Sequence, residues 1–340
     1  MTDQPDDVGS HTSPTARPGS AESNTAPAHG HLHHVRNLIS SQVSQVVVGQ
    51  QVVVDQILIC LAVRGHVLLE GVPGVAKTLL ASALAKSMGL GFKRAQFTPD
   101  MLPSDLTGTM SLRDRELVFR PGPVFTNVLL ADEINRTPPK TQAALLEAMQ
   151  ETQVTVEGEP RALPEPFLVV ATQNPIEYEG TYPLPEAQLD RFLIKVTVDY
   201  PSEADELNLL RLARSGIRST TLDQIRPVVD AASVANMRAE VDATRLSDEV
   251  LAYAAGIIRA TRILPSVQVG ASPRAGVHLL SAARAVARLG GRDFVTPDDV
   301  AWASKPVLSH RLVLAPEAEL DRFGPDEAIA AALQTVPVPR

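Results

Sequence analysis

The most informative segment of this chain reads Gly71-Val72-Pro73-Gly74-Val75-Ala76-Lys77-Thr78. It follows an apolar run, His66 to Glu70, and it precedes a helix-like run, Leu79 to Lys86. A strand, a glycine-bearing loop and a helix that begins at Lys-Thr form the phosphate-binding loop of nucleotide-binding ATPases. In such a loop, backbone N–H groups and the positive end of the helix converge on the phosphate oxygens. The sequence therefore predicts a phosphate-binding loop here.

The residue types in this loop predict ATP and Mg²⁺ as ligands. Lys77 supplies a positive charge to the β- and γ-phosphates, and the Thr78 hydroxyl is a ligand suited to Mg²⁺. Ala76 stands where the strict pattern has glycine, and we expect it to be tolerated because alanine in a helical conformation carries no backbone penalty. The predicted nucleotide-binding residues of the loop are Gly71, Val72, Pro73, Gly74, Val75, Ala76, Lys77, Thr78 and Leu79.

A second motif, which is acidic, lies further along the chain, where the apolar run Asn127 to Ala131 ends in Asp132 and Glu133. A buried parallel strand reads as a continuous apolar run, and ligands bind beyond the carboxyl ends of such strands. Asp132 is predicted to hold the Mg²⁺ shell, and Glu133 to orient and polarise the attacking water. The alternative is a strand followed by a solvated acidic turn, but the loop upstream favours the catalytic interpretation.

Composition limits the class of protein. The chain has 340 residues, of which 44% are hydrophobic, enough for a large domain and a smaller one. Its formal net charge of −8 does not favour binding to nucleic acid. The single cysteine, Cys60, lies in an apolar run and is expected to be buried. No run approaches the roughly 20 apolar residues of a membrane span, and the N-terminus lacks a signal-peptide pattern, so we expect a cytoplasmic protein without a membrane span.

Four segments differ in pattern along the chain. Residues 1–34 are rich in polar residues and proline, and we expect a disordered polar tail. Residues 35–200 alternate strands and helices, which indicates an α/β core with a parallel sheet. Residues 201–315 carry helical patterns only and predict a smaller all-α lid domain. Residues 316–340 form a C-terminal extension.

The expected elements of the core are strands near 66–70, 92–97, 127–133, 167–172 and 193–198, helices near 52–63, 77–88 and 137–150, and hairpins near 110–119 and 153–163. Residues 98–106 contain two prolines and predict a broken short helix. Helices of the second domain are expected near 203–215, 231–239, 247–262, 274–288 and 297–304, and Ser202, Ser247 and Thr296 are suitable N-caps.

The order of these motifs resembles an AAA+ ATPase, and more closely the MoxR family. Four segments carry the resemblance: the phosphate loop with Ala76, Leu130 to Arg136, Ala171 to Pro175, and Gly180 to Phe192. The match extends from about Val43 to Leu314. It implies a P-loop NTPase fold, with a parallel sheet, flanking helices and a lid.

The resemblance also implies further site residues. Asn174 matches the sensor-1 position, and Arg191 matches an arginine finger that acts on the nucleotide of a neighbouring subunit. Arg274, in Ser272-Pro273-Arg274, matches sensor 2. The alternatives are a turn asparagine, a local salt bridge of Arg191 with Asp190 or Glu186, and a surface arginine at 274. The segment that borders the adenine is matched by Val48, Gly49 and Gln50.

The assembly and client are likewise implied by the resemblance. The hairpins match the helix-2 insert and the pre-sensor-1 hairpin, which are expected to contact a substrate or partner, or else simply to complete the sheet edge. The family implies a homo-oligomer, a hexameric ring, and chaperone-like maturation or metal insertion of a client with a von Willebrand factor A domain. Alternatives are a nucleic-acid-remodelling motor and a chelatase motor subunit; a transcription-activator ATPase is disfavoured because its Gly-Ala-Phe-Thr-Gly-Ala loop is absent from the sequence.

Overall fold

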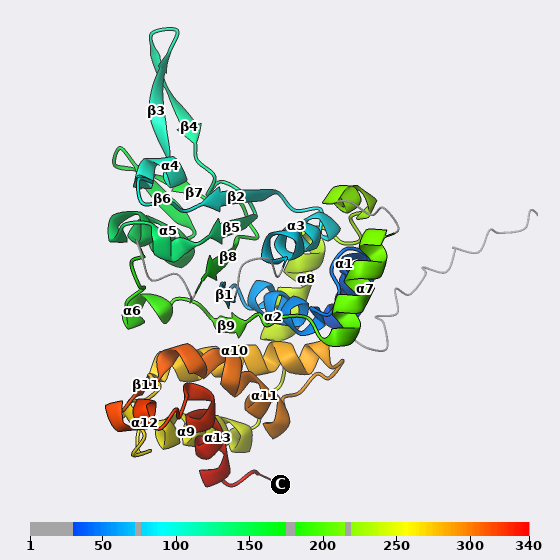
Figure 1. Ribbon diagram of the computed structural model, residues 1–340, viewed down its shortest axis with the longest axis vertical. Helices are drawn as coiled ribbons and strands as arrows, with labels where there is room; N and C mark the ends of the chain where they lie inside the picture. Colours follow the sequence, from blue (N-terminus) through cyan, green and yellow to red (C-terminus); the bar gives the residue numbers. More distant parts are fainter. Residues whose placement is uncertain (1–29, 72–75, 175–180, 215–218, 340) are drawn as a thin grey trace, which may run out of the picture.

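The computed structural model describes residues 30–71, 76–174, 181–214 and 219–339. Three parts follow one another along the long axis: a projecting hairpin, an α/β core and a helical lid (Figure 1). The core contains the segments predicted to bind the nucleotide.

Five parallel strands form the central sheet in the order β2-β5-β8-β1-β9. Their bounds are β2 (Phe92–Gln96), β5 (Val128–Asp132), β8 (Leu168–Gln173), β1 (Val67–Glu70) and β9 (Ile194–Thr197). All adjacent pairs run parallel, as predicted from the alternation of strands and helices. Strand β5 is buried along its whole length, which explains why its sequence is a continuous apolar run.

The sheet separates two hydrophobic cores, because successive side chains of a strand point to opposite faces. In β1, Leu69 belongs to the core shared with α2 (Gln51–Ala62) and α3 (Lys77–Ser87). Leu68 belongs to the core on the other face, which includes α5 (Pro139–Glu151). Cys60 is buried and free, as predicted. The sheet therefore holds its carboxyl ends rigidly between two packed layers.

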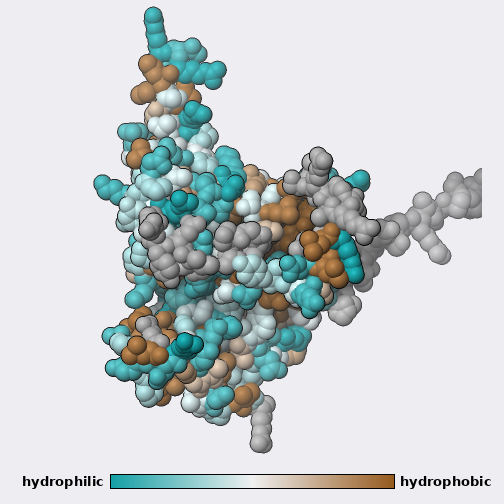
Figure 2. Space-filling model, viewed as in Figure 1, coloured by the Kyte–Doolittle hydropathy of each residue, from teal (hydrophilic) through white to brown (hydrophobic). Residues whose placement is uncertain are grey.

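Two hairpins interrupt the core. The first consists of β3 (Gly108–Arg113) and β4 (Glu116–Pro121), and it follows the short helix α4 (Pro103–Thr107). The second consists of β6 (Gln153–Val156) and β7 (Glu159–Ala162). The first hairpin projects away from the body of the molecule and carries hydrophobic residues at its surface (Figures 1 and 2).

The lid consists of helices with one short β-ladder. Its helices are α9 (Asp248–Thr261), α10 (Pro273–Leu289), α11 (Pro297–Leu308), α12 (Pro316–Leu320) and α13 (Pro325–Thr335). The ladder pairs β10 (Val267–Val269) with β11 (Val313–Leu314), and it was not predicted because two or three residues are too few to show an alternating pattern. The predicted caps form, since Ser247 accepts from Val250 N and Thr296 makes a capping box with Asp299.

Helices α1 (His31–Val43), α6 (Glu186–Leu189), α7 (Glu203–Arg214) and α8 (Ala231–Asp242), with the 3₁₀ turns η1 (Ile134–Arg136), η2 (Ser219–Gln224) and η3 (Ser309–Arg311), complete the described chain. Helix α1 begins four residues before the predicted start of order at Val35. The Glu240 carboxylate accepts hydrogen bonds from the backbone N–H groups of His31 and Leu32, at 3.0 and 2.7 Å. This long-range contact satisfies two of the free donors of the helix start, and local composition does not reveal it.

Helix α8, predicted in the lid, places Val234 and Met237 in a hydrophobic cluster that joins α1 and α2 to the lid helix α10. Helix α13, in the predicted extension, buries Ala328 and Ile329. Among the helices of the described ranges, none is both long and apolar enough to cross a membrane.

Candidate active site

Lys77 stands at the first turn of α3, directly beyond the carboxyl end of β1. Its Nζ donates a hydrogen bond to the carbonyl oxygen of Gly71 at 2.7 Å. Burial lowers the pKa of Lys77, while the charges of Asp132, Glu133 and Glu70 act in the opposite direction. The lysine is therefore held half-buried among three carboxylates. Val72, Pro73, Gly74 and Val75 lie outside the described residues.

The two ends of the loop have distinct backbone requirements. A Cβ at Gly71 would lie 2.4 Å from the carbonyl oxygen of Val198, so only glycine fits beside the end of β9. Ala76 adopts a left-handed conformation, with φ 60° and ψ 23°. The expectation that Ala76 is unstrained is thus wrong, because a left-handed conformation costs an alanine about 1–2 kcal/mol. Thr78 and Leu79 follow it in the first turn of α3, half-buried.

Asp132 ends β5 with its side chain only 12% exposed. Thr172 donates its hydroxyl to Oδ1 of Asp132 at 2.5 Å. Arg94, on the neighbouring strand β2, donates to Oδ2 from Nε and Nη2 at 3.0 and 2.6 Å. Asp132 is therefore a firmly held carboxylate with a cationic partner at the carboxyl edge of the sheet.

Glu133 follows in a left-handed conformation, with φ 58°. Its backbone N–H donates to Thr172 Oγ1 at 2.9 Å, so one threonine fixes both acidic residues. Its Oε2 accepts hydrogen bonds from Gln96 Nε2 at 2.8 Å and from Arg136 Nη1 at 3.0 Å. This conformation turns the Glu133 side chain away from the path of the strand and toward residues of β2 and η1.

Asn174 directly follows β8, which lies between β5 and β1 in the sheet. It is 6% exposed, and its carbonyl oxygen accepts a hydrogen bond from Asn135 Nδ2 at 3.5 Å. Parallel strands bring their carboxyl ends to one edge, so Asn174, Asp132 and Lys77 share that edge. Pro175 and residues 176–180 lie outside the described residues.

The donor set at this edge fits a magnesium–triphosphate. The Asp132 carboxylate and the Thr78 hydroxyl are hard oxygen ligands of the kind that Mg²⁺ prefers. The Lys77 ammonium group provides positive charge for phosphate oxygens.

Lys77 follows the carboxyl end of β1, whereas Arg191 and Arg274 lie near the amino end of that strand. Leu193, two residues after Arg191, donates its N–H to the carbonyl of His66, just before β1 begins. Both arginines line a cavity of about 190 Å³ together with Gly65, His66 and His278. From His66 to Gly71 the strand advances about 16 Å, more than an arginine side chain can span.

The surroundings of Arg191 differ from the local salt bridge raised as an alternative, whereas Arg274 is exposed, as its surface alternative expects. Arg191 Nη1 donates to the carbonyl of Leu146 at 3.1 Å. Asp190 pairs instead with Arg311 at 2.6 Å and approaches Arg274 at 4.0 Å. Within the described ranges, Arg191 forms no ion pair with Asp190 or Glu186. Among the described residues, no carboxylate is ion-paired with the Arg191 guanidinium group, which is half-buried.

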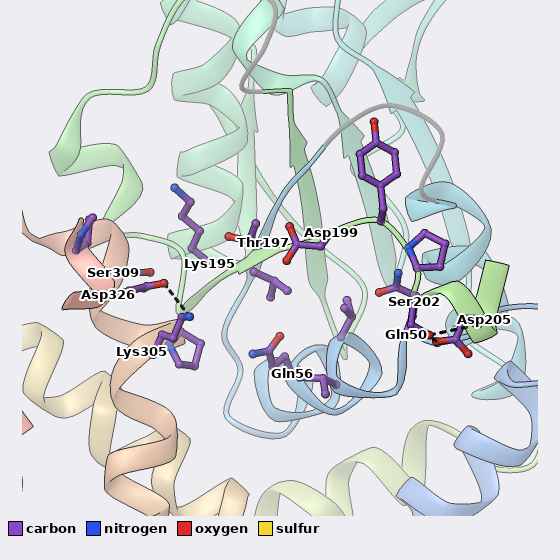
Figure 3. Close-up of a pocket in the computed structure, with 18 residues that line it drawn as sticks. Gln50, Gln56, Lys195, Thr197, Asp199, Ser202, Asp205, Lys305, Ser309 and Asp326 are labelled. Carbon is purple, nitrogen blue, oxygen red and sulfur yellow. Dashed lines mark hydrogen bonds and ion pairs between the residues drawn. The ribbon is translucent and has the colours of Figure 1, made fainter. Parts of the chain in front are cut away.

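A second cavity, of about 600 Å³, lies between the core and the lid (Figure 3). Gly49, Gln50 and Tyr200 line it from the core. Lys305 and Asp326, an ion pair at 2.7 Å, line it from the lid. Gly49 has φ 76°, and a Cβ there would lie 2.6 Å from Asp205 Oδ2, so this segment requires glycine. Val48 precedes it and is half-buried.

Sequence reasoning missed three residues at the catalytic edge. Gln96 ends β2 beside β5, and the rule that ligands gather at carboxyl ends could have indicated it. Thr172 lies in a quoted motif, but nothing in the sequence reveals its bond to Asp132. Arg94 had no assigned role in the sequence, and its guanidinium group pairs with Asp132.

Comparison with protein families agrees with this arrangement. Residues 66–194 match the family described as "ATPase family associated with various cellular activities (AAA)". Residues 259–332 match the AAA lid domain.

Individual relatives cover almost the whole chain. The protein YeaC of Bacillus subtilis is 46% identical over 91% of this chain and 96% of its own length. Chaperone MoxR1 of Mycobacterium tuberculosis is 43% identical over 96% of this chain and 86% of its own length. A solved Cytophaga hutchinsonii structure, described provisionally as an ATPase, has a TM-score of 0.84 and 40% identity, and the match covers 91% of this chain and 97% of that one.

Proposed function

The chain belongs to the MoxR family of AAA ATPases, and we propose that it hydrolyses ATP with Mg²⁺ at sites shared between adjacent subunits. One observation carries the proposal. Lys77, Asp132 and Glu133 lie at the carboxyl ends of the parallel strands, and Arg191 and Arg274, which line the smaller cavity, lie near the start of β1. A single subunit therefore contains both the nucleotide-binding half and the arginine half of the proposed site, but the two halves do not face each other.

In the binding half, we assign Lys77 to the β- and γ-phosphates and Thr78 and Asp132 to the metal shell. The bound Mg²⁺ would neutralise charge that develops on the phosphate oxygens. Thr172 keeps the Asp132 carboxylate oriented, since its hydroxyl donates to Oδ1. The bond from Lys77 to the Gly71 carbonyl holds the ammonium group close to the loop.

Glu133 is assigned to polarise the attacking water. Its carboxylate accepts from Gln96 and Arg136, so its orientation depends on strand β2 and on the turn η1. Asn174 is assigned to hold the water or the γ-phosphate, since a neutral amide can donate without competing for the proton.

Arg191, with Arg274 beside it, is assigned to the nucleotide of the neighbouring subunit. An arginine that reaches the γ-phosphate stabilises the charge of the transition state and is worth about 10³–10⁵ in turnover in other phosphate-transfer enzymes. Head-to-tail contacts that close generate rings, and we propose a hexamer.

The larger cavity is assigned to the adenine end of the nucleotide. Gly49 and Gln50 contribute backbone and an amide at its core side, while Lys305 and Asp326 border it from the lid (Figure 3). A ligand in this position contacts both domains, so nucleotide binding and lid position are coupled.

We further propose that the motor remodels a client protein with a von Willebrand factor A domain. The projecting hairpin supports a contact role, because it carries hydrophobic residues at its surface (Figure 2). Leu112 and Leu117 of this hairpin are 73% and 69% exposed. The double variant Leu112→Ser, Leu117→Ser should keep basal ATP hydrolysis and lose binding to a purified client domain. Undiminished client binding would rule out this surface.

Mixing inactive variants tests the shared site. Glu133→Gln subunits keep their arginines but lack the water-polarising carboxylate, and Arg191→Ala subunits have the reverse defect. Each variant alone should be inactive, and mixtures should recover part of the wild-type rate because Arg191→Ala sites can receive an arginine from a Glu133→Gln neighbour. Absence of recovery in rings that are shown to contain both variants would overturn the shared site. A mixture of Glu133→Gln with Lys77→Ala is the matched control, since both defects lie in the same half and no recovery is expected.

A further inference from the structure

Arg311 is a buried arginine of the lid that contacts the turn carrying Arg191. It ends η3, between α11 and β11, and its side chain is only 3% exposed. A fully buried guanidinium group is costly unless its N–H groups are paired, so its partners indicate what it is for.

Most of these partners belong to the turn between α6 and β9. Arg311 Nε donates to Asp190 Oδ1 at 2.6 Å, and Nη2 donates to the carbonyl oxygens of Asp190 and Phe192 at 3.1 and 2.6 Å. Nη1 donates to the carbonyl oxygen of Leu193 at 3.2 Å. The guanidinium group thus binds the backbone on both sides of Arg191.

The remaining partners lie in the lid. Nη1 donates to the carbonyl oxygen of Val307 in α11, and Nη2 lies 2.7 Å from His278 Nδ1 in α10. Nη1 also lies 2.7 Å from His310 Nε2, which is itself 3.0 Å from the carbonyl of Phe192. One side chain therefore joins two lid helices to residues 190, 192 and 193 of the core.

Asp190 connects this cluster to the second arginine of the shared site. Its Oδ1 accepts from Arg311, and its Oδ2 lies 4.0 Å from Arg274 Nε. Arg274 belongs to α10, the helix that also carries His278. The carboxylate of Asp190 is thus placed between a buried arginine and an arginine that faces the cavity.

From this geometry we propose that Arg311 is a positioning residue: with Asp190 as its partner, it sets the direction of Arg191 and Arg274 toward the neighbouring nucleotide. The inference rests on the shared site proposed above. Because the guanidinium group is held by α10 and α11, a shift of the lid moves the turn that carries Arg191. A change in the lid position of one subunit would thereby change the placement of its arginines at the active site of the next subunit.

The planar fork of arginine is essential to this role, and lysine cannot replace it. A lysine has three donors at one point, too few and too close together to replace the five hydrogen bonds that Arg311 makes to the Asp190 carboxylate and four carbonyl oxygens. We expect Arg311→Lys to lower kcat by about tenfold or more while the Kd for ATP of the same subunit changes less than about twofold, as expected for loss of a group that acts on the transition state. Asp190→Asn keeps the shape of the partner and should give a smaller loss of kcat.

Trans-complementation separates positioning from a merely structural role. Arg311→Lys subunits mixed with Glu133→Gln subunits should recover activity, because the Arg311→Lys sites then receive a correctly placed arginine from their neighbour. The matched control is Arg245→Lys, a lid arginine in an exposed ion pair with Asp293, which should leave kcat unchanged. Thermal unfolding of each variant, and its ring formation, are measured in parallel.

The outcomes are distinguishable. Recovery for both Arg191→Ala and Arg311→Lys supports the inference. Recovery for Arg191→Ala without recovery for Arg311→Lys overturns the positioning role and leaves the shared site intact. No recovery for either overturns the shared site itself. Should Arg311→Lys fail to fold, Asp190→Asn enters the same assay, and an unchanged kcat for that variant counts against the proposal.

Discussion

Arg94 directs two of its three nitrogens, Nε and Nη2, at a single carboxylate oxygen of Asp132, and Nη2 also donates to Gln96 Oε1. The other oxygen of Asp132 accepts from Thr172. The residue assigned to the metal shell thus carries its own counter-charge, supplied by the neighbouring strand β2. A positive group so close to a proposed cation site weakens the attraction between that site and Mg²⁺.

We therefore expect Arg94→Gln to lower the Mg²⁺ concentration that gives half-maximal ATP hydrolysis. Removal of a unit charge several ångström from a divalent cation changes its binding by on the order of 1 kcal/mol, or about fivefold. The measurement is a Mg²⁺ titration at saturating ATP. Lys93→Gln is the control, because Lys93 is the preceding residue of β2 and its Nζ donates to the Gly122 carbonyl instead. Equal shifts for both variants would exclude a specific effect of the Arg94–Asp132 pair.

Replacing Ala76 by glycine should stabilise the protein. The residue has φ 60°, a conformation that glycine adopts without a steric penalty. Glycine has more conformational entropy than alanine in the unfolded chain, and this offsets part of the benefit. The net increase in the free energy of unfolding should be about 0.5–1 kcal/mol. Urea unfolding measures it. Ala143→Gly, at an exposed position inside helix α5, should have the opposite sign and cost about 1 kcal/mol. A loss of stability in both variants would contradict the argument from the backbone.

Lys77→Met should abolish tight nucleotide binding. The substitution removes the ammonium group that lies among the charges of Asp132, Glu133 and Glu70, and it leaves an excess of negative charge facing the phosphates. Loss of charge-assisted bonds to a triphosphate should raise the Kd for ATP by about 100-fold or more. Calorimetric titration with ATP and Mg²⁺ provides the test. Lys86→Met, on the same helix but bonded to the Leu222 carbonyl, should bind ATP normally. Wild-type affinity in Lys77→Met would refute the phosphate-binding assignment.

We expect the free energy of unfolding to fall in mild acid because of the buried His66. Its ring is buried between the Met149 carbonyl and the Val169 N–H, and burial lowers its pKa to about 4. In the unfolded chain the pKa of histidine is about 6.5, so below that pH the unfolded state binds the proton and the folded state does not. Stability contributed by the neutral ring is therefore present above about pH 7 and lost as the pH falls toward 4. Burial likewise lowers the pKa of His278 to about 4, with the same sign.

The expected magnitude for His66 alone is about 2 kcal/mol between about pH 7.5 and pH 5. Urea unfolding at the two pH values measures it, and His66→Gln should lose part of the pH dependence. His34→Gln, at an exposed position of α1, should retain all of it. A pH profile of His66→Gln identical to that of the wild type would contradict the assignment.

The centre of the parallel sheet was predictable because strands β5, β8 and β1 are buried on both faces and read as nearly unbroken apolar runs, whereas the outer strand β2 was indicated by its alternating pattern. Leu129 and Leu130 point into different cores, yet both must be apolar, so the pattern in the sequence is strong. The positions of Lys77, Asp132 and Asn174 at one edge follow from the direction of the strands alone. By contrast, a single long-range bond, such as that from Thr172 to Asp132, has no counterpart in local sequence.

The arginines show where sequence reasoning stops. The family resemblance singled out Arg191 and Arg274, but nothing in the sequence distinguished Arg94 or Arg311, whose contacts depend on which residues fold against them. Arg311 has no distinctive neighbours in sequence, and only the structure reveals that it is enclosed by the carbonyls of residues 190, 192 and 193. Conversely, the strain at Ala76 was missed because a residue pattern does not report a dihedral angle.

Lys77 and Arg191 lie at opposite ends of β1, and this separation affects how many complete sites an assembly can contain. With the proposed shared site, an open row of protomers always ends in a subunit whose nucleotide has no arginine opposite it, whatever the length of the row. Only closure of the row into a ring gives every subunit a neighbour on that side. Turnover per chain should therefore rise steadily as short rows lengthen and then reach its ceiling when the circle is completed.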